Sequence, residues 1–191
     1  MSEMRFNLII AGVGGQGTLL AGKIIGQAAL MASLDVKISE VHGMAQRGGS
    51  VITHVRAGQS VHAPLVSPGE ADFLLAFEVL EGARSAYFLK PGGLLIVNTD
   101  RILPMPVITG SVPYPDDPLH SARSLYQVDE IDAMSAAVLA GNPQAVNMTL
   151  LGALSVKLPF SRDIWLGAIS LSVPGKTLDT NLKAFDLGVN R

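Results

Sequence analysis

Residues 6–17 read FNLIIAGVGGQG, an apolar run that ends in glycines. The nearly continuous apolar stretch Phe6–Ala11 is typical of a central parallel strand that is buried on both faces. The glycines that follow predict a tight turn. Thr18–Leu34 then carries apolar and small residues at helical spacing, which predicts a helix in close contact with a sheet. The order is therefore strand, glycine turn, helix.

The rest of the chain continues this alternation of strands and helices. We expect an α/β fold, with a Rossmann-like, doubly wound and mostly parallel sheet, an antiparallel hairpin excursion and three layers. Residues 1–191 are expected to form a single domain. Expected strands lie at 36–39, 50–56, 60–66, 71–77, 94–98 and 124–129, with 50–56 and 60–66 paired as the hairpin. Expected helices lie at 79–89, 131–139, 145–158, 162–171 and 180–187, the last capped by Thr180 and stopped by Gly188, and proline-rich 101–118 is expected to be an extended connector.

Composition excludes several classes of function. The 191 residues carry a formal net charge of −2, which is not the basic excess of a nucleic-acid-binding protein. The chain has no cysteine, so it cannot itself ligate an iron–sulfur cluster through thiolates or use a cysteine nucleophile. No stretch approaches the length of a membrane span, and the N-terminal residues lack the pattern of a signal peptide, so we expect a cytoplasmic protein with no membrane partner.

The glycine run is a candidate phosphate site. Gly12, Gly14 and Gly17 satisfy G-x-G-x-x-G between a strand and a helix, where backbone N–H groups and the helix dipole favour an anion. The structural alternative is a tight turn that needs positive φ and close packing. A dinucleotide site also needs an acid about 20 residues further on, for a ribose hydroxyl. Glu40 falls near that position and Asp35 less well, so a nicotinamide or flavin enzyme stays open.

A second cluster, HGMAQRGGS at 42–50, is expected to form a binding loop at the same edge of the sheet. Arg47 is suited to bind a phosphate or carboxylate through two parallel hydrogen bonds, and the amides of Gly48 and Gly49 are suited to an anion nest. Alternatively, Arg47 pairs with Glu40 or Asp72, and His42 is an ordinary loop histidine. We predict no catalytic residue and no metal ligand in this chain. The candidate binding residues are Gly12, Gly14, Gly15, Gln16, Gly17, Gln46, Arg47, Gly48, Gly49 and Ser50.

Other polar residues favour structural roles. His54 and His62 are expected to pair across the hairpin or to face solvent. Glu78 and Glu81 suit the first turn of a helix, and 98–100 suits a turn in which Asn and Asp bond their own backbone. The small residues around Leu151–Ala153 indicate close packing against the sheet or another subunit.

Together these motifs resemble one known family, the gamma subunits or gamma domains of 2-oxoacid:ferredoxin oxidoreductases. HGMAQRGG is most similar to the indolepyruvate-type branch. The resemblance leaves only the proline-rich middle and 157–176 weakly placed. It rests on IIAGVGGQGTLLAGKII, VHGMAQRGGSVITHVR, EADFLLAFEVLEGAR, KPGGLLIVNT, NMTLLGAL and NLKAFDLG.

The resemblance implies a division of labour within a complex. A large partner subunit would bind thiamine diphosphate, Mg and iron–sulfur clusters, decarboxylate an aryl 2-oxoacid and reduce ferredoxin, while coenzyme A takes the acyl group. This chain would bind no cofactor alone and would contribute a Rossmann-like domain packed against the thiamine-binding domains. Two alternatives stay open, a free-standing oxidoreductase that uses NAD or a flavin and a non-catalytic interaction domain.

Overall fold

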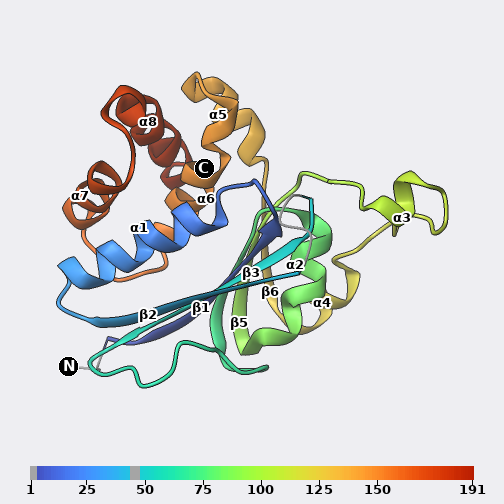
Figure 1. Cartoon of the computed structure of the whole chain (residues 1–191), viewed down its shortest axis with the longest axis horizontal. Coiled ribbons are helices and arrows are strands. Elements are labelled where there is room, and N and C mark those ends of the chain that lie inside the picture. Colours follow the sequence, from blue (N-terminus) through green and yellow to red (C-terminus); the bar gives the residue numbers. More distant parts are fainter. Residues whose placement is uncertain (1–3, 44–47) are drawn as a thin grey trace.

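A computed structural model of the chain describes residues 4–43 and 48–191. Its strands form one sheet in the order β2-β3-β1-β4-β5-β6 (Figure 1). The strands are β1 (Phe6–Val13), β2 (Asp35–His42), β3 (Ser50–Gly58), β4 (Ala71–Ala76), β5 (Leu89–Asn98) and β6 (Gln127–Ile131). The α-helices are α1 (Thr18–Met31), α2 (Val79–Ser85), α3 (Met105–Ile108), α4 (His120–Leu125), α5 (Ala133–Ala140), α6 (Val146–Ser155), α7 (Arg162–Ser172) and α8 (Leu178–Val189). Short 3-10 helices are η1 (Ala86–Phe88), η2 (Pro143–Ala145) and η3 (Gly175–Thr177).

The sheet is mostly parallel, as the sequence predicted. β1, β4, β5 and β6 pair in parallel, whereas β3 is antiparallel to both of its neighbours, β1 and β2. From β1 the chain crosses toward one side of the sheet through α1, and from β4 it crosses toward the other side through α2. The carboxyl ends of β1 and β4 therefore flank the point where the winding reverses, which is where doubly wound sheets bind ligands.

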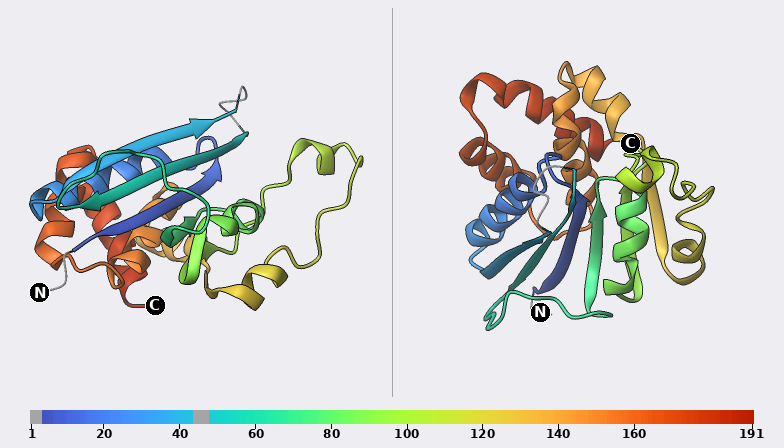
Figure 2. Two further views of the ribbon diagram at one scale, coloured as in Figure 1. Left: turned by 90° about the horizontal axis from the view of Figure 1, so that it is seen from below. Right: turned by 45° about the vertical axis from the view of Figure 1, so that its right-hand side comes forward.

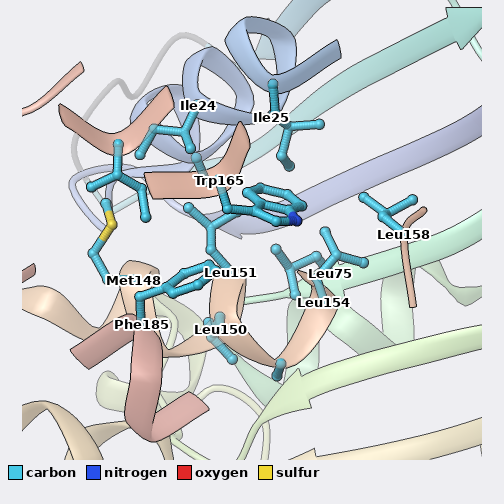
Figure 3. Packing of buried hydrophobic residues seen from close by; sticks show 14 of the residues in the cluster. Ile24, Ile25, Leu75, Met148, Leu150, Leu151, Leu154, Leu158, Trp165 and Phe185 are labelled. Carbon is cyan, nitrogen blue, oxygen red and sulfur yellow. The ribbon is translucent and has the colours of Figure 1, made fainter. Parts of the chain in front are cut away.

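Helices cover both faces of this sheet and make three layers (Figures 1 and 2). The first strand shows why: Leu8 and Ile10 pack into the core beneath α1 and α5–α8, while Ile9 and Ala11 pack into the core beneath α2 and α4. Alternate side chains of a strand point to opposite faces, so a continuous apolar run is what a doubly covered strand requires. Trp165 of α7 lies between α1 and α6 in the larger core (Figure 3).

The antiparallel excursion differs from the prediction. The hairpin is formed by β2 and β3, and no strand lies at 60–66, where the chain runs as an irregular segment. β2 is also longer than expected and reaches His42. His54 and His62 consequently do not pair. The ring of His54 is buried, where its Nδ1 accepts a hydrogen bond from the Val66 N–H at 3.1 Å and its edge meets Phe88.

The C-terminal helices pack on one another more closely than expected. A Cβ on Gly152 would lie 2.0 Å from the carbonyl oxygen of Phe185, and one on Gly188 would lie 2.0 Å from that of Thr149. Gly152 of α6 therefore packs against α8, a neighbour that the sequence did not predict for these small residues. Gly188 lies inside α8 instead of stopping it, and the residue before its first turn is Thr177 instead of Thr180.

The proline-rich connector projects from the body of the molecule, as the left view of Figure 2 shows for the segment around α3. Its apolar side chains are largely solvent-exposed; they are Ile102, Leu103, Met105, Ile108 and Val112. The sequence did not predict α3 or α4, and β6 begins three residues later than expected. No helix in the part of the chain that the structure describes is long and apolar enough to cross a membrane.

Candidate functional site

Gln16 ties the glycine turn to the carboxyl edge of the sheet. Its side-chain oxygen accepts a hydrogen bond from the Val13 N–H at 2.7 Å, and its side-chain NH₂ donates to the carbonyl oxygen of Phe77 at 3.0 Å. Val13 ends β1 and Phe77 directly follows β4. The Gln16 side chain therefore fills the space between the two strand ends at the point where the winding reverses.

The glycines make room for this arrangement. A Cβ on Gly12 would lie 2.9 Å from Thr18 Cγ2 and 3.0 Å from Gln16 Oε1, so a larger residue would displace the turn. Gly17 has φ of +86° at the N-cap of α1, and a Cβ there would lie 2.8 Å from Asn147 Nδ2. Both findings support the structural interpretation of the glycine pattern, since only glycine adopts this φ at low cost.

The two predicted loops meet, as expected from their common edge. The N–H of Gly14 donates to the carbonyl oxygen of Gly49 at 2.8 Å, and the N–H of Gly48 donates to that of Gly14 at 3.4 Å. Ser50 begins β3, and its hydroxyl donates to the buried carboxylate of Glu81 at 2.5 Å. Gln46 and Arg47 lie outside the described residues, so the proposed anion contacts of Arg47 stay a prediction.

A cavity of about 640 Å³ opens at this edge beside the N-terminus of α1. Its lining comes from the glycine turn, the residues after β5, and the consecutive elements α5, η2 and the start of α6. The lining residues are Gly15, Gln16, Gly17, Asp100, Arg101, Ile102, Met134, Pro143, Gln144, Val146 and Asn147. Of the predicted site residues, the cavity thus contains Gly15, Gln16 and Gly17.

Asn147 and Arg101 are site residues that the sequence analysis missed. Asn147 is 5% exposed, and within the described chain its side-chain NH₂ has no hydrogen-bond acceptor, although it lies against Gly17 at the cavity wall. Arg101 is exposed and makes no ion pair with another described residue. Both groups are donors beside the positive end of the α1 dipole, an arrangement that suits an anionic ligand.

Glu78 holds the base of the projecting connector next to this cavity. It caps α2 by accepting the Glu81 N–H at 2.8 Å, in keeping with its predicted helix-terminal role. Its second oxygen accepts the Ile102 N–H at 3.2 Å and the Tyr114 hydroxyl at 3.0 Å. Burial, together with the negative charge of Glu78, raises the pKa of Tyr114 to about 12, so the phenol stays neutral.

Asn98 has a structural role that differs from the predicted turn. Its NH₂ donates to the carbonyl oxygen of Phe77 at 3.2 Å, and its side-chain oxygen accepts the Ala133 N–H at 3.2 Å. These bonds reach other segments and not its own backbone. Phe77 therefore accepts hydrogen bonds from both Gln16 and Asn98, which joins the glycine turn, β4 and β5 at one carbonyl group.

The geometry does not suit a dinucleotide. Glu40 lies within β2, which β3 separates from β1, and its carboxylate faces the Thr53 hydroxyl at 3.4 Å. The ribose-binding acid of a dinucleotide site lies at the end of the strand beside the glycine turn, so the expectation for Glu40 was wrong. Asp35 lies at the opposite end of β2. In addition, the Gln16 side chain lies between the ends of β1 and β4, bonded to Val13 and Phe77.

The remaining titratable groups show no metal centre. Within residues 4–43 and 48–191, no three His, Asp or Glu side chains are placed to hold a metal ion. Asp72 bonds Lys90 and the Asn7 N–H, and its suggested pairing with Arg47 involves a residue outside the described part of the chain. Glu81 bonds Arg84 at 2.8 Å in addition to Ser50. The described charges at the edge are therefore largely committed, apart from those that line the cavity.

A family model described as pyruvate ferredoxin/flavodoxin oxidoreductase matches residues 7–191. The chain belongs to this family. The match spans nearly the whole chain. It confirms the resemblance of the sequence motifs to the 2-oxoacid:ferredoxin oxidoreductase family. It also confirms that the chain is of an oxidoreductase family.

Relatives in the pyruvate ferredoxin/flavodoxin oxidoreductase family are small subunits of oxoacid enzymes. The chain is 42% identical over 192 residues to the indolepyruvate oxidoreductase subunit IorB of Thermococcus kodakarensis, covering 96% of this chain and 94% of that protein. The keto/oxoacid ferredoxin oxidoreductase gamma subunit of Geobacter sulfurreducens has the same fold, with a TM-score of 0.71 at 25% identity over 97% of this chain and 96% of that chain.

A third similar structure shows the fold within a longer polypeptide. The 2-oxoglutarate:ferredoxin oxidoreductase of Magnetococcus marinus matches 98% of this chain but only 31% of that chain, with a TM-score of 0.74 and 22% identity. That structure was solved with 2-oxoglutarate, coenzyme A and succinyl-CoA bound. The same α/β fold is therefore found both as a separate subunit and as about a third of a larger chain.

Proposed function

We propose that this chain is the cofactor-free subunit of a thiamine-dependent 2-oxoacid:ferredoxin oxidoreductase that forms acyl-CoA, CO₂ and reduced ferredoxin. A large partner subunit holds thiamine diphosphate, Mg and the iron–sulfur clusters. The relatives' names support indolepyruvate or another aryl pyruvate as the 2-oxoacid, and a cytoplasmic location and a single domain over residues 1–191 belong to the same proposal. Thiamine diphosphate supplies the carbanion chemistry, so this chain needs no acid–base pair of its own.

The observation that carries the proposal is the cavity at the carboxyl edge. The turn Gly15–Gly17 at the N-terminus of α1, Asn147 and Arg101 line one space, and no described side chain caps this helix. Phosphate is the ligand chemistry that helix N-termini and guanidinium groups favour. Among the reactants of the proposed reaction, coenzyme A is the one that carries phosphates. We therefore assign the phosphates of coenzyme A to this cavity, with Gly15, Gln16 and Gly17 on one wall.

Exposed apolar groups on α5 and on the connector, two segments that also line the cavity, support docking of the large subunit near this edge. Helix α5 has no charged residue, and Val138 and Leu139 on its outer side are 56% and 66% exposed. Met105 and Ile108 of the projecting connector are 66% and 61% exposed. Exposed apolar patches of this kind mark interaction surfaces. The large subunit would cover them and close the cavity, which places coenzyme A between the two subunits.

A matched pair of variants tests the cavity in the assembled complex. Gln144→Glu puts a negative charge on the cavity rim, so we expect the KM for coenzyme A to rise on the order of tenfold, with the KM for the 2-oxoacid unchanged. Gln59→Glu makes the same change at an exposed position of the opposite edge and should leave both constants unaltered. If the KM for coenzyme A is the same in the two variants, coenzyme A does not bind in this cavity.

The identity of the 2-oxoacid is tested on the same complex. Initial rates with indolepyruvate, phenylpyruvate, pyruvate and 2-oxoglutarate would be compared at a fixed concentration of coenzyme A. We expect the aryl substrates to give the highest kcat/KM. A preference for 2-oxoglutarate would contradict the substrate class without affecting the role of the subunit.

A further inference from the structure

Arg101 stands out among the residues that line the cavity. It follows β5, beyond the functional edge of the sheet, in a segment that the sequence analysis treated only as a connector. The acidic residue of the lining is Asp100, immediately before it. An arginine without an ion pair among the described residues, beside a helix N-terminus, is available for a ligand anion.

The position of Arg101 is set by two residues behind it. Its guanidinium carbon lies 5.4 Å from the centre of the Tyr114 ring, within the range of a cation–π contact. The Tyr114 hydroxyl in turn donates to Glu78, which is 1% exposed and also accepts the N–H of Ile102, next to Arg101. Glu78 thus fixes both the backbone beside Arg101 and the ring beneath its guanidinium.

We propose that Arg101 binds a phosphate of coenzyme A in the cavity, and that Tyr114 and Glu78 are positioning residues that hold its guanidinium there. This inference rests on the proposed function, since it adds one residue to the proposed coenzyme site. It gives the proline-rich connector a role in binding a ligand, in addition to joining β5 to the rest of the chain. Stacking on a ring limits the conformations of the long side chain, so less freedom is lost when the phosphate binds.

The test uses the complex of this chain with its large subunit. Arg101→Gln should raise the KM for coenzyme A about tenfold, because a charge-assisted hydrogen bond is lost, with kcat and the KM for the 2-oxoacid unchanged. Arg101→Lys should recover part of this loss, since the charge remains without the planar fork. Arg5→Gln removes an exposed arginine from the opposite edge and is the matched control.

The positioning role has its own readout. Tyr114→Leu should raise the KM for coenzyme A as Arg101→Gln does, whereas Tyr114→Phe, which keeps the ring, should have the smaller effect. The double variant Arg101→Gln/Tyr114→Leu should be no worse than Arg101→Gln alone, because the ring acts through the guanidinium. Additive losses would show that Tyr114 acts independently of Arg101 and would overturn its assignment.

Dephospho-coenzyme A identifies the phosphate. A loss in Arg101→Gln that is confined to coenzyme A assigns the 3′-phosphate, and an equal loss with both compounds assigns the diphosphate; either result supports the inference. An unchanged KM for coenzyme A in Arg101→Gln, while Gln144→Glu still raises it, would overturn the role of Arg101 alone. If neither variant changes the KM, the proposed site itself is wrong.

Discussion

Single side chains decide what the carboxyl edge of this sheet is able to bind. Gln16 fills the crevice between β1 and β4, and Glu40 is held apart from the glycine turn by β3. The glycine pattern resembles that of a dinucleotide site. In this chain it forms a tight turn whose Gln16 side chain bonds both strand ends. The cavity lies beside this turn, where Asn147 and Arg101 supply donors that come from distant parts of the chain.

Gln16→Glu tests this closure. The new carboxylate has no N–H to donate to Phe77 and places an oxygen against that carbonyl group. We expect a loss of about 1–3 kcal/mol in the free energy of unfolding, measured as a lower denaturant midpoint with unchanged slope. Gln59→Glu, which is exposed, should stay within about 0.5 kcal/mol of the wild type. A Gln16→Glu protein as stable as this control would mean that the bond to Phe77 does not hold the turn.

His54 makes stability depend on pH. Burial lowers the pKa of His54 below its ordinary value of 6.5, and Nδ1 must be unprotonated to accept the Val66 N–H. The unfolded chain then binds more protons than the folded one below about pH 7, so stability is fully present above 6.5 and falls as the pH drops through the folded pKa.

Denaturant unfolding at pH 7.5 and pH 5.5, both above the titration range of aspartates, measures this pH dependence. Between these two pH values, the free energy of unfolding of His54→Leu should decrease less than that of the wild type. The variant should also be less stable than the wild type at pH 7.5. The exposed His62 serves as the control, since His62→Leu should keep the wild-type pH dependence. The same pH dependence in His54→Leu would contradict a neutral, hydrogen-bonded His54.

At the scale of elements, the contact between α6 and α8 explains the glycine within α6, Gly152, and the glycine in the last turn of α8, Gly188. Each glycine faces a backbone carbonyl group of the other helix, so the two backbones touch without intervening side chains. Asn147, the second residue of α6, lines the cavity. The packing of two helices on the outer layer thus fixes the position of a site residue at the sheet edge.

Gly152→Ala is expected to separate the two helices. Its Cβ would meet a carbonyl oxygen, which cannot move without the whole of α8, and we expect a loss of about 3 kcal/mol or more in the free energy of unfolding. Gly167→Ala in α7 is the matched control, because its Cβ would meet only the flexible end of Met31 and alanine favours a helix. Calorimetry should therefore show a large decrease in Tm for the first variant only. Similar Tm values would contradict the close contact.

At the scale of the whole molecule, much of the fold could be predicted because its signals are local. Apolar runs such as Phe6–Ala11 and the glycine turn identify the buried strands and the first crossover within short windows. The place of β3 between β1 and β2 could not be predicted, since strand pairing depends on long-range contacts that leave no local periodicity. The sequence indicated a hairpin but joined the wrong segments.

The candidate site was predictable only where it follows the sheet edge. The glycine turn and the second loop were expected to meet, and Gly14 and Gly49 do so. Arg101 and Asn147 were missed as cavity residues because connectors and helices of small residues carry no pattern for ligand contact. The one available signal for Asn147 was its place in the NMTLLGAL motif that contributed to the family resemblance.

Assembly with the large subunit is tested on the exposed face of α5. Leu139→Asp should weaken co-purification of the two subunits, because a carboxylate would be buried in the proposed interface. Leu171→Asp is matched in exposure, as both leucines are 66% exposed, but lies on α7. It should co-purify like the wild type. Equal yields of complex for both variants would move the interface away from α5.

Reconstitution shows whether this chain works only together with a large subunit. Reduction of ferredoxin would be followed with indolepyruvate and coenzyme A for this chain alone, for the large thiamine- and iron–sulfur-bearing subunit alone, and for the two together. We expect coenzyme A-dependent turnover only in the mixture, with no saturable NAD binding by the isolated chain. NAD binding by the isolated chain that is lost in Glu40→Ala, or full turnover by the large subunit without this chain, would contradict this expectation.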